Sequence, residues 1–76
     1  MKSAQQIYDT AVKNMPRSPE WKAGALAGLK RRASPHLRQP SPFRPASAQD
    51  DAWRAGVQYG LDVWAWNQPE TERASA

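Results

Sequence analysis

Apolar residues recur at helical spacing in three stretches of this chain, and prolines separate the stretches. In the first, four apolar positions follow each other at intervals of three or four residues: Ala4, Ile7, Ala11 and Met15. Residues at this spacing lie on one side of an α-helix. Pro16 cannot continue the helix. The pattern therefore predicts a first helix over about residues 3–15.

The second stretch carries signals for the start and the end of a helix. Ser18 is a favourable N-cap, and Pro19 fits the first helical position. Glu20 follows in the first turn, where the helix dipole favours an acid. Residues 30–32 are all basic, as the last turn of a helix prefers. We therefore expect a second helix from Pro19 to about Ala33.

The third stretch predicts the longest helix. Ser47 is again a favourable N-cap, with two acids, residues 50 and 51, in the first turn. The helix should extend to about Asn67 and stop before Pro69. Most of its circumference is apolar or small, so it is either central to the fold or in contact with a second chain; a homodimer is one expectation. Its polar stripe is narrow and consists of Arg54, Gln58 and Asp62.

Two tryptophans near the end of this helix fall on different faces. Trp64 and Trp66 are two positions apart, which is about 200° around a helix. Both cannot point into one small core, so at least one should be partly exposed. An exposed indole is typical of an interaction surface, and we take both residues as candidates for a protein interface.

A nine-residue pattern occurs in both longer helices. Residues 21–29 read W-K-A-G-A-L-A-G-L, and residues 53–61 read W-R-A-G-V-Q-Y-G-L. In each helix the Trp, both Gly and the Leu gather on one face. Gly inside a helix costs about 1 kcal/mol relative to Ala, so the matched glycines indicate close packing. The two helices are therefore expected to pack through Trp21, Gly24, Gly28, Trp53, Gly56 and Gly60.

The connection between these helices is rich in proline. Residues 34–48 contain four prolines, a density that excludes a helix or a central strand. We expect an extended, partly polyproline-like loop. No β pattern is visible, so the predicted fold is all-α, with an N-terminal helix in residues 1–16 and a helix–loop–helix domain over residues 17–68. Residues 69–76 are expected to form a disordered tail.

Composition narrows the chemistry. The chain has 76 residues, one His and no Cys, so we expect one small domain with no disulfide, no metal site and no other cofactor. Neither a membrane span nor the apolar core of a signal peptide is visible, so the expected location is the cytoplasm, without a membrane partner. Motifs for a nucleophile elbow, a phosphate-binding loop or a paired-His site are missing, so we predict no catalytic residue and no enzyme activity.

The net charge of +4 is unevenly distributed. Between residues 17 and 44, seven Lys and Arg residues stand against Glu20 alone, whereas the chain from Pro45 onward is mildly acidic. This asymmetry favours a polyanionic partner, with nucleic acid as the first candidate. The candidate RNA-binding residues are Lys30, Arg31, Arg32, His36, Arg38, Phe43 and Arg44.

These residues have two interpretations. The basic side chains can contact RNA phosphates, and the Phe43 ring offers a face for an unpaired base. Alternatively, the basic triplet complements the dipole of a helix end and the loop is only solvated. His36 has no adjacent catalytic partner in the sequence, so we interpret it as exposed or hydrogen-bonded. Composition alone leaves the two interpretations of the basic residues in balance.

The order of small and aromatic residues resembles the ribosome modulation factor family, a grouping that includes CrpP-type small proteins of plasmids and phages. The resemblance covers roughly residues 20–64. It is carried by Gly24, Ala27, Gly28, Ser41-Pro42-Phe43, Ala52, Trp53, Gly56 and Gly60. It implies a helix–loop–helix unit. The best-known member binds small-subunit ribosomal RNA and promotes inactive ribosome dimers, which implies that the basic helix end and the loop face RNA.

Two functions remain open from the sequence. One is a small RNA-binding protein of the ribosome-modulation type, which binds ribosomal RNA or ribosomes without catalysis. The other is a phage- or plasmid-encoded interaction protein that inhibits a host nucleic-acid-binding complex, as the apolar third helix favours. A drug-modifying activity of the CrpP type is supported by no constellation of residues in this sequence.

Overall fold

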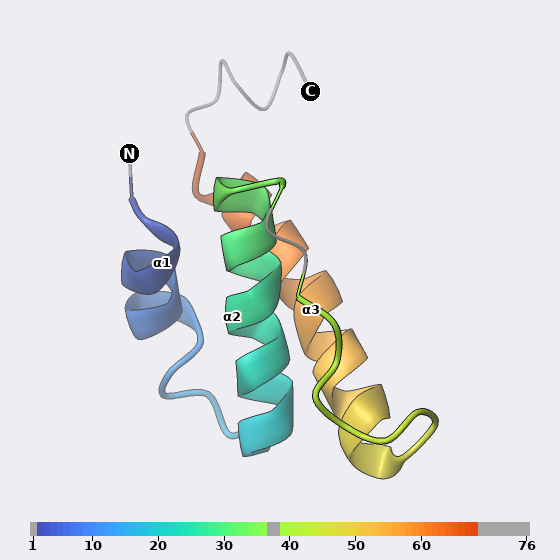
Figure 1. The fold of residues 1–76 in the computed structure, drawn as a ribbon. Coiled ribbons are helices and arrows are strands. Elements are labelled where there is room, and N and C mark those ends of the chain that lie inside the picture. Colours follow the sequence, from blue (N-terminus) through green and yellow to red (C-terminus); the bar gives the residue numbers. More distant parts are fainter. Residues whose placement is uncertain (1, 37–38, 69–76) are drawn as a thin grey trace.

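The computed structural model describes residues 2–36 and 39–68, and the helices in this part are α1 (Ala4–Ala11), α2 (Pro19–Ala33) and α3 (Ala48–Trp66) (Figure 1). This part of the chain contains no strand, so the all-α prediction is confirmed. The predicted tail, 69–76, lies outside the described residues. Both predicted caps form: the Ser18 hydroxyl accepts the Trp21 N–H at 3.2 Å, and the Ser47 hydroxyl accepts the Asp50 N–H at 3.1 Å.

The first helix is shorter than the predicted span of residues 3–15. It ends at Ala11, and the N–H groups of Val12 and Lys13 both reach the Tyr8 carbonyl, at 3.0 and 2.9 Å. The chain then turns, so that Val12 is fully buried although it lies off the predicted apolar face. Pro16 sets the latest position at which the helix can end. The helix ends earlier, at Ala11, and the turn that follows places Val12 in the core.

The two longer helices run in the same direction. In Figure 1 both α2 and α3 rise from the lower end of the molecule to the upper end. α2 has 15 residues and is about 22 Å long, so the connection over residues 34–47 has to return along that length. This return explains why the prolines are tolerated, because an extended loop covers distance without needing helical hydrogen bonds.

The glycines bring the backbones of α2 and α3 into direct contact. A Cβ atom added to Gly24 would overlap the Trp53 carbonyl oxygen, and one added to Gly56 would overlap the Trp21 carbonyl oxygen. The next pair behaves in the same way. Added Cβ atoms would overlap Val57 O from Gly28, and Ala25 O from Gly60. The two repeats therefore pack as parallel equivalents. Each glycine faces the carbonyl that lies three positions earlier in the pattern of the other repeat, and we call this contact the glycine seam.

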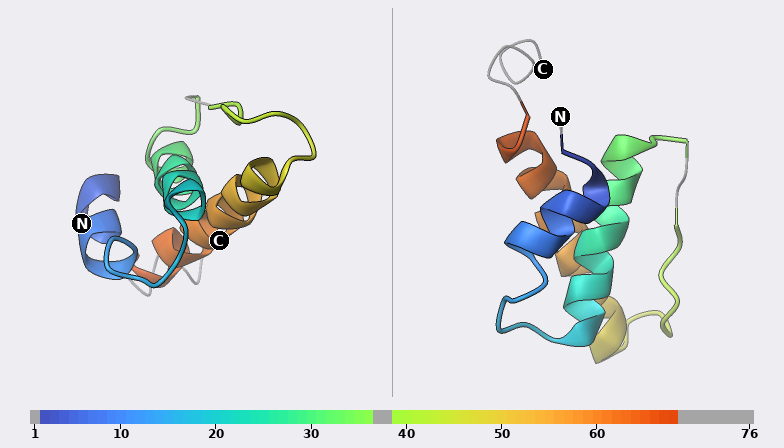
Figure 2. Two further views of the ribbon diagram at one scale, coloured as in Figure 1. Left: turned by 90° about the horizontal axis from the view of Figure 1, so that it is seen from below. Right: turned by 90° about the vertical axis from the view of Figure 1, so that its left-hand side faces the viewer.

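Two sides of the α2–α3 pair are covered by different parts of the chain. α1 lies on one side, and the loop passes along another (Figure 2). Beneath α1 sits the core, where Ile7, Val12 and Leu29 are completely buried. Apolar packing thus concentrates on the α1 side. The loop side is held by polar contacts and contains the hollows described next.

Candidate nucleic-acid interface

The basic triplet at the end of α2 spreads around the helix and does not share one face. Lys30 borders a hollow of about 390 Å³ between α2 and Pro40 of the loop. Arg32 borders another hollow, of about 380 Å³, together with Pro35 and Leu61. Arg31 lines this second hollow as well as a larger cleft. Successive residues differ by about 100° around a helix, which explains the spread.

The predicted loop residues His36, Phe43 and Arg44 line none of the hollows beside that triplet. His36 and Arg44 are exposed, and Phe43 is half-buried with its N–H donated to the Ser41 hydroxyl at 3.2 Å. The Arg44 carbonyl accepts the Ser47 N–H at 3.1 Å, just before α3 begins. None of these three side chains lines the large cleft beside Arg31. Arg38 lies outside the described residues.

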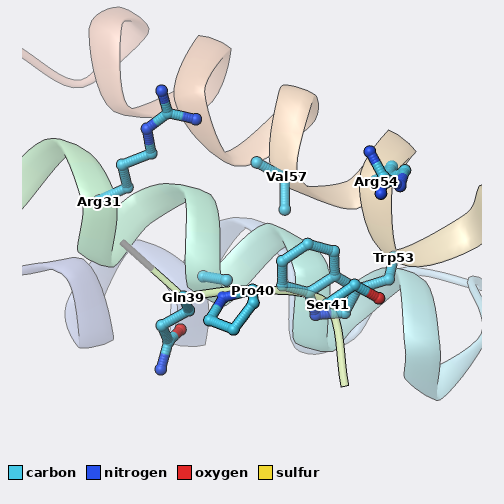
Figure 3. A pocket seen from close by; sticks show the side chains of 8 residues that line it. Arg31, Gln39, Pro40, Ser41, Trp53, Arg54 and Val57 are labelled. Carbon is cyan, nitrogen blue, oxygen red and sulfur yellow. The ribbon is translucent and has the colours of Figure 1, made fainter. Parts of the chain in front are cut away.

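The large cleft lies between α2, α3 and the loop and has a volume of about 530 Å³ (Figure 3). Arginines stand at its margins, Arg31 from α2 and Arg54 from α3, as Figure 3 shows. From the sequence, Arg54 was expected on the polar stripe of α3 with Gln58 and Asp62, and it was not among the candidate RNA-binding residues. The full lining is Ala27, Arg31, Gln39, Pro40, Ser41, Trp53, Arg54 and Val57.

A buried carboxylate anchors the loop beside this cleft. Asp50 is only 3% exposed, and its Oδ2 accepts the Ala46 N–H at 3.2 Å and the Arg54 Nε–H at 2.9 Å. Ala46 has a positive φ of 63°, which is unusual for a residue other than glycine, so this hydrogen bond holds a strained turn. This role was not predicted, since Asp50 was expected only to favour the helix dipole.

The surroundings of Asp50 favour its charged form. The nearby Ser41 hydroxyl, the Arg54 guanidinium and the Ala46 N–H lower the pKa of the Asp50 carboxyl, and they outweigh burial, which acts in the opposite direction. Its Oδ1 has no hydrogen bond of good geometry within the described residues. Asp50 is therefore an anion at neutral pH, and it engages the Arg54 Nε while the guanidinium side chain stays 68% exposed.

Charge pairing is sparse in the part of the chain that the structure describes. Within residues 2–36 and 39–68, the only ion pair is that of Asp50 and Arg54. Within those ranges, no carboxylate neutralises Lys30, Arg31, Arg32 or Arg44. Among the described residues, the end of α2 and the part of the return loop just before α3 therefore present uncompensated positive charge.

An aromatic row occupies the other side of the helix pair. The Trp21 and Tyr59 ring centroids are 4.9 Å apart, and those of Tyr59 and Trp66 are 6.0 Å apart in an edge-to-face arrangement. The Arg17 guanidinium lies 4.7 Å from the Trp21 ring centroid. Trp66, at the end of the row, is 61% exposed, whereas Trp64 is partly buried against the core.

The two repeat tryptophans have different surroundings. Trp21 is 6% exposed and belongs to the main core. Trp53 is 8% exposed, but it lines the cleft beneath the loop. Their equivalent positions in the repeat therefore do not give them equivalent neighbours.

Comparison with protein-family models, with curated proteins and with solved structures gives no match. Within the described residues, no group of three or more His, Cys, Asp or Glu side chains is placed to hold a metal ion. None of the helices in that part of the chain combines the length and the apolar character needed to cross a membrane.

Proposed function

We propose that this protein binds RNA, without catalysis, through the end of α2 and the loop that follows it. The observation that carries the proposal is the unpaired positive charge at Lys30, Arg31, Arg32 and Arg44 among the described residues. Phosphate groups neutralise such side chains and release counterions, which is the main source of sequence-independent affinity for nucleic acids.

The resemblance to the ribosome modulation factor family adds the class of RNA. We propose ribosomal RNA in the cytoplasm as the target, with Arg31 and Arg32 on phosphates and Phe43 beneath an unpaired base. The partial exposure of Phe43 and the exposure of His36 and Arg44 support this arrangement, because these side chains are accessible from solvent.

The dependence of RNA affinity on salt tests the proposal. For a single strand, the slope of log K against log salt is about −0.7 per contacted phosphate. We expect the double variant Arg31→Ala, Arg32→Ala to bind RNA more weakly. The slope of log K against log salt should become less negative by about the contribution of two phosphates. Phe43→Ala should weaken binding by about 1–3 kcal/mol with little change in slope, because stacking releases no counterions.

The control for charge alone is Lys13→Ala. Lys13 is exposed and lies two residues after the end of α1, so Lys13→Ala removes one positive charge, half of what the double arginine variant removes, without touching the proposed surface. Arg54 is unsuitable for this purpose because it lines the cleft and pairs with Asp50. Unchanged RNA affinity in the double arginine variant would leave the basic triplet as a helix end only and would remove the proposal.

The exposed end of the aromatic row favours a second candidate. Trp66 is a large apolar side chain with 61% of its surface exposed, as is typical of a residue that contacts a protein. An interaction protein of phage or plasmid origin, which blocks a host nucleic-acid-binding complex, would use this face. Affinity recovery from a bacterial lysate separates the two candidates: ribosomal material lost on nuclease treatment supports RNA binding, and a nuclease-resistant protein complex supports the second.

A further inference from the structure

The two repeats carry different side chains at their seventh position. In the second repeat this position is Tyr59, whose ring lies 4.9 Å from the Trp21 ring centroid. In the first repeat the same position is Ala27. Because the glycine seam relates the repeats as parallel equivalents, Ala27 stands beside Trp53 as Tyr59 stands beside Trp21. The Trp53 side therefore lacks one aromatic ring.

The missing ring coincides with the large cleft. Both Ala27 and Trp53 line it, and its volume of about 530 Å³ falls within the range of about 300–1,000 Å³ that is typical of small-molecule sites. Half of its lining residues are apolar: Ala27, Pro40, Trp53 and Val57. The volume is thus large enough for a flat ring beside these apolar side chains.

The charged side chains that line the cleft itself are both arginines, and the buried Asp50 carboxylate lies beside it. Arg31 and Arg54 both line it, and no carboxylate does. Asp50 engages the Nε of Arg54, which leaves the terminal nitrogens of that guanidinium without a hydrogen bond among the described residues. Two guanidiniums at the margin of an apolar cleft favour a ligand that joins an anionic group to a planar ring.

We infer that this cleft binds a nucleoside monophosphate unit. Its base lies beside Trp53 in the place that Tyr59 takes beside Trp21, and its phosphate is held by Arg31. Gln39 and Ser41 supply hydrogen-bonding groups from the loop for the edge of the base. The unit is either a free nucleotide or one unpaired nucleotide of an RNA, and the latter case rests on the proposed RNA binding.

The test is a titration of the full chain with adenosine monophosphate. Binding is followed by calorimetry and by the NMR shift of the Trp53 indole N–H. We expect the variant Ala27→Tyr to abolish binding, because it fills the cleft with the ring that the other repeat already carries. Arg31→Gln should weaken binding about tenfold by removing a charged hydrogen bond to phosphate. Lys13→Gln, which removes a positive charge outside the cleft, is the matched control and should bind as the parent does.

The outcomes are separable. Parent-like binding by a folded Ala27→Tyr variant overturns the inference, and so does inorganic phosphate that binds as tightly as the nucleotide. If Ala27→Tyr does not fold, parent-like binding by Arg31→Gln overturns it instead. For an RNA oligonucleotide, loss of affinity in Ala27→Tyr supports a nucleotide inserted from RNA. Adenosine monophosphate bound by a chain that does not bind RNA supports a free-nucleotide site and removes the proposed RNA binding alone.

Discussion

The Trp21 side and the Trp53 side of the helix pair are built from the same nine-residue pattern, yet only one of them is closed. On the Trp21 side, Tyr59 packs on the indole and Arg17 lies over it. On the Trp53 side, the position of Tyr59 is taken by Ala27, and the cleft opens there. The exchange of Tyr59 for Ala27, one of four differences between the repeats, thus goes with the difference between a closed side and a side with an open cleft.

The two sides also differ in how they are covered. α1 contributes apolar side chains to the core, whereas the loop is fixed largely by the polar contacts of Asp50. Apolar burial does not depend on pH, whereas the polar contacts of the Asp50 carboxylate weaken when acid protonates it. Stability and accessibility are therefore assigned to opposite sides of one seam.

Breaking the seam should have the largest effect, because both sides depend on it. A Cβ on Gly56 overlaps the Trp21 carbonyl oxygen and comes within 2.9 Å of the Ala25 nitrogen, so α2 and α3 must separate to accept a side chain. We expect Gly56→Leu to reduce the free energy of unfolding by about 3 kcal/mol, the upper part of the usual overpacking range. Urea denaturation followed by circular dichroism measures this loss.

The control for the seam is the adjacent residue. Ala55 is exposed on α3, so Ala55→Leu adds the same side-chain type to the same helix without meeting α2. Its free energy of unfolding should stay within about 0.5 kcal/mol of the parent value. Equal stability of the Gly56 and Ala55 variants would contradict the close approach of the two backbones.

Loosening the Trp53 side alone should have a smaller effect that depends on pH. The folded state lowers the pKa of Asp50, so its contribution to stability is complete above the unfolded pKa of about 3.9 and disappears as the pH falls through the folded value. We expect Asp50→Asn to lower the thermal midpoint at pH 7, and the difference from the parent to narrow below about pH 4. Calorimetry over pH 2–7 measures both midpoints.

The matched control is Asp62→Asn. Asp62 is exposed on the same helix and accepts one hydrogen bond, from Gln58 at 3.1 Å. Its replacement should change the midpoint little at any pH. A constant gap between parent and Asp50→Asn across the whole pH range would mean that the charge of Asp50 does not anchor the loop.

The smallest effect on stability is expected at the exposed end of the aromatic row. Trp66 makes an edge contact with Tyr59 and is otherwise mostly solvent-exposed, so Trp66→Ala should cost less than about 1 kcal/mol. We expect the parent chain to dimerise through this indole. Sedimentation should then show an association that the variant lacks, and a parent that stays monomeric at high concentration would contradict the dimer.

The helices were predictable because their signals are local. The capping serines and the repeated glycines marked α2, α3 and the face on which they meet. The parallel direction was not, because glycine faces of the same spacing can also pack antiparallel. The early end of α1 was missed for a similar reason: only tertiary packing reveals that Val12 is worth burying.

The cleft could not be derived from the sequence alone. Its lining combines the last turns of α2, the first turns of α3 and residues 39–41, which only the path of the loop brings together. Arg31 was a candidate from local charge, but Arg54 was assigned to the polar stripe of α3. The one sequence signal that bears on the cleft is the exchange of Tyr59 for Ala27 at equivalent positions, and it has meaning only once the seam is known.

The parallel course of α2 and α3 also has a kinetic consequence. In an antiparallel helix hairpin, the first contacts form next to the turn and spread away from it. Here each glycine meets a carbonyl from the other repeat, so no contact of the seam is local in sequence. Closing the intervening chain costs entropy before any of these contacts can compensate for it, which slows folding. During synthesis, the glycine face of the first repeat therefore has no seam partner until the second repeat emerges.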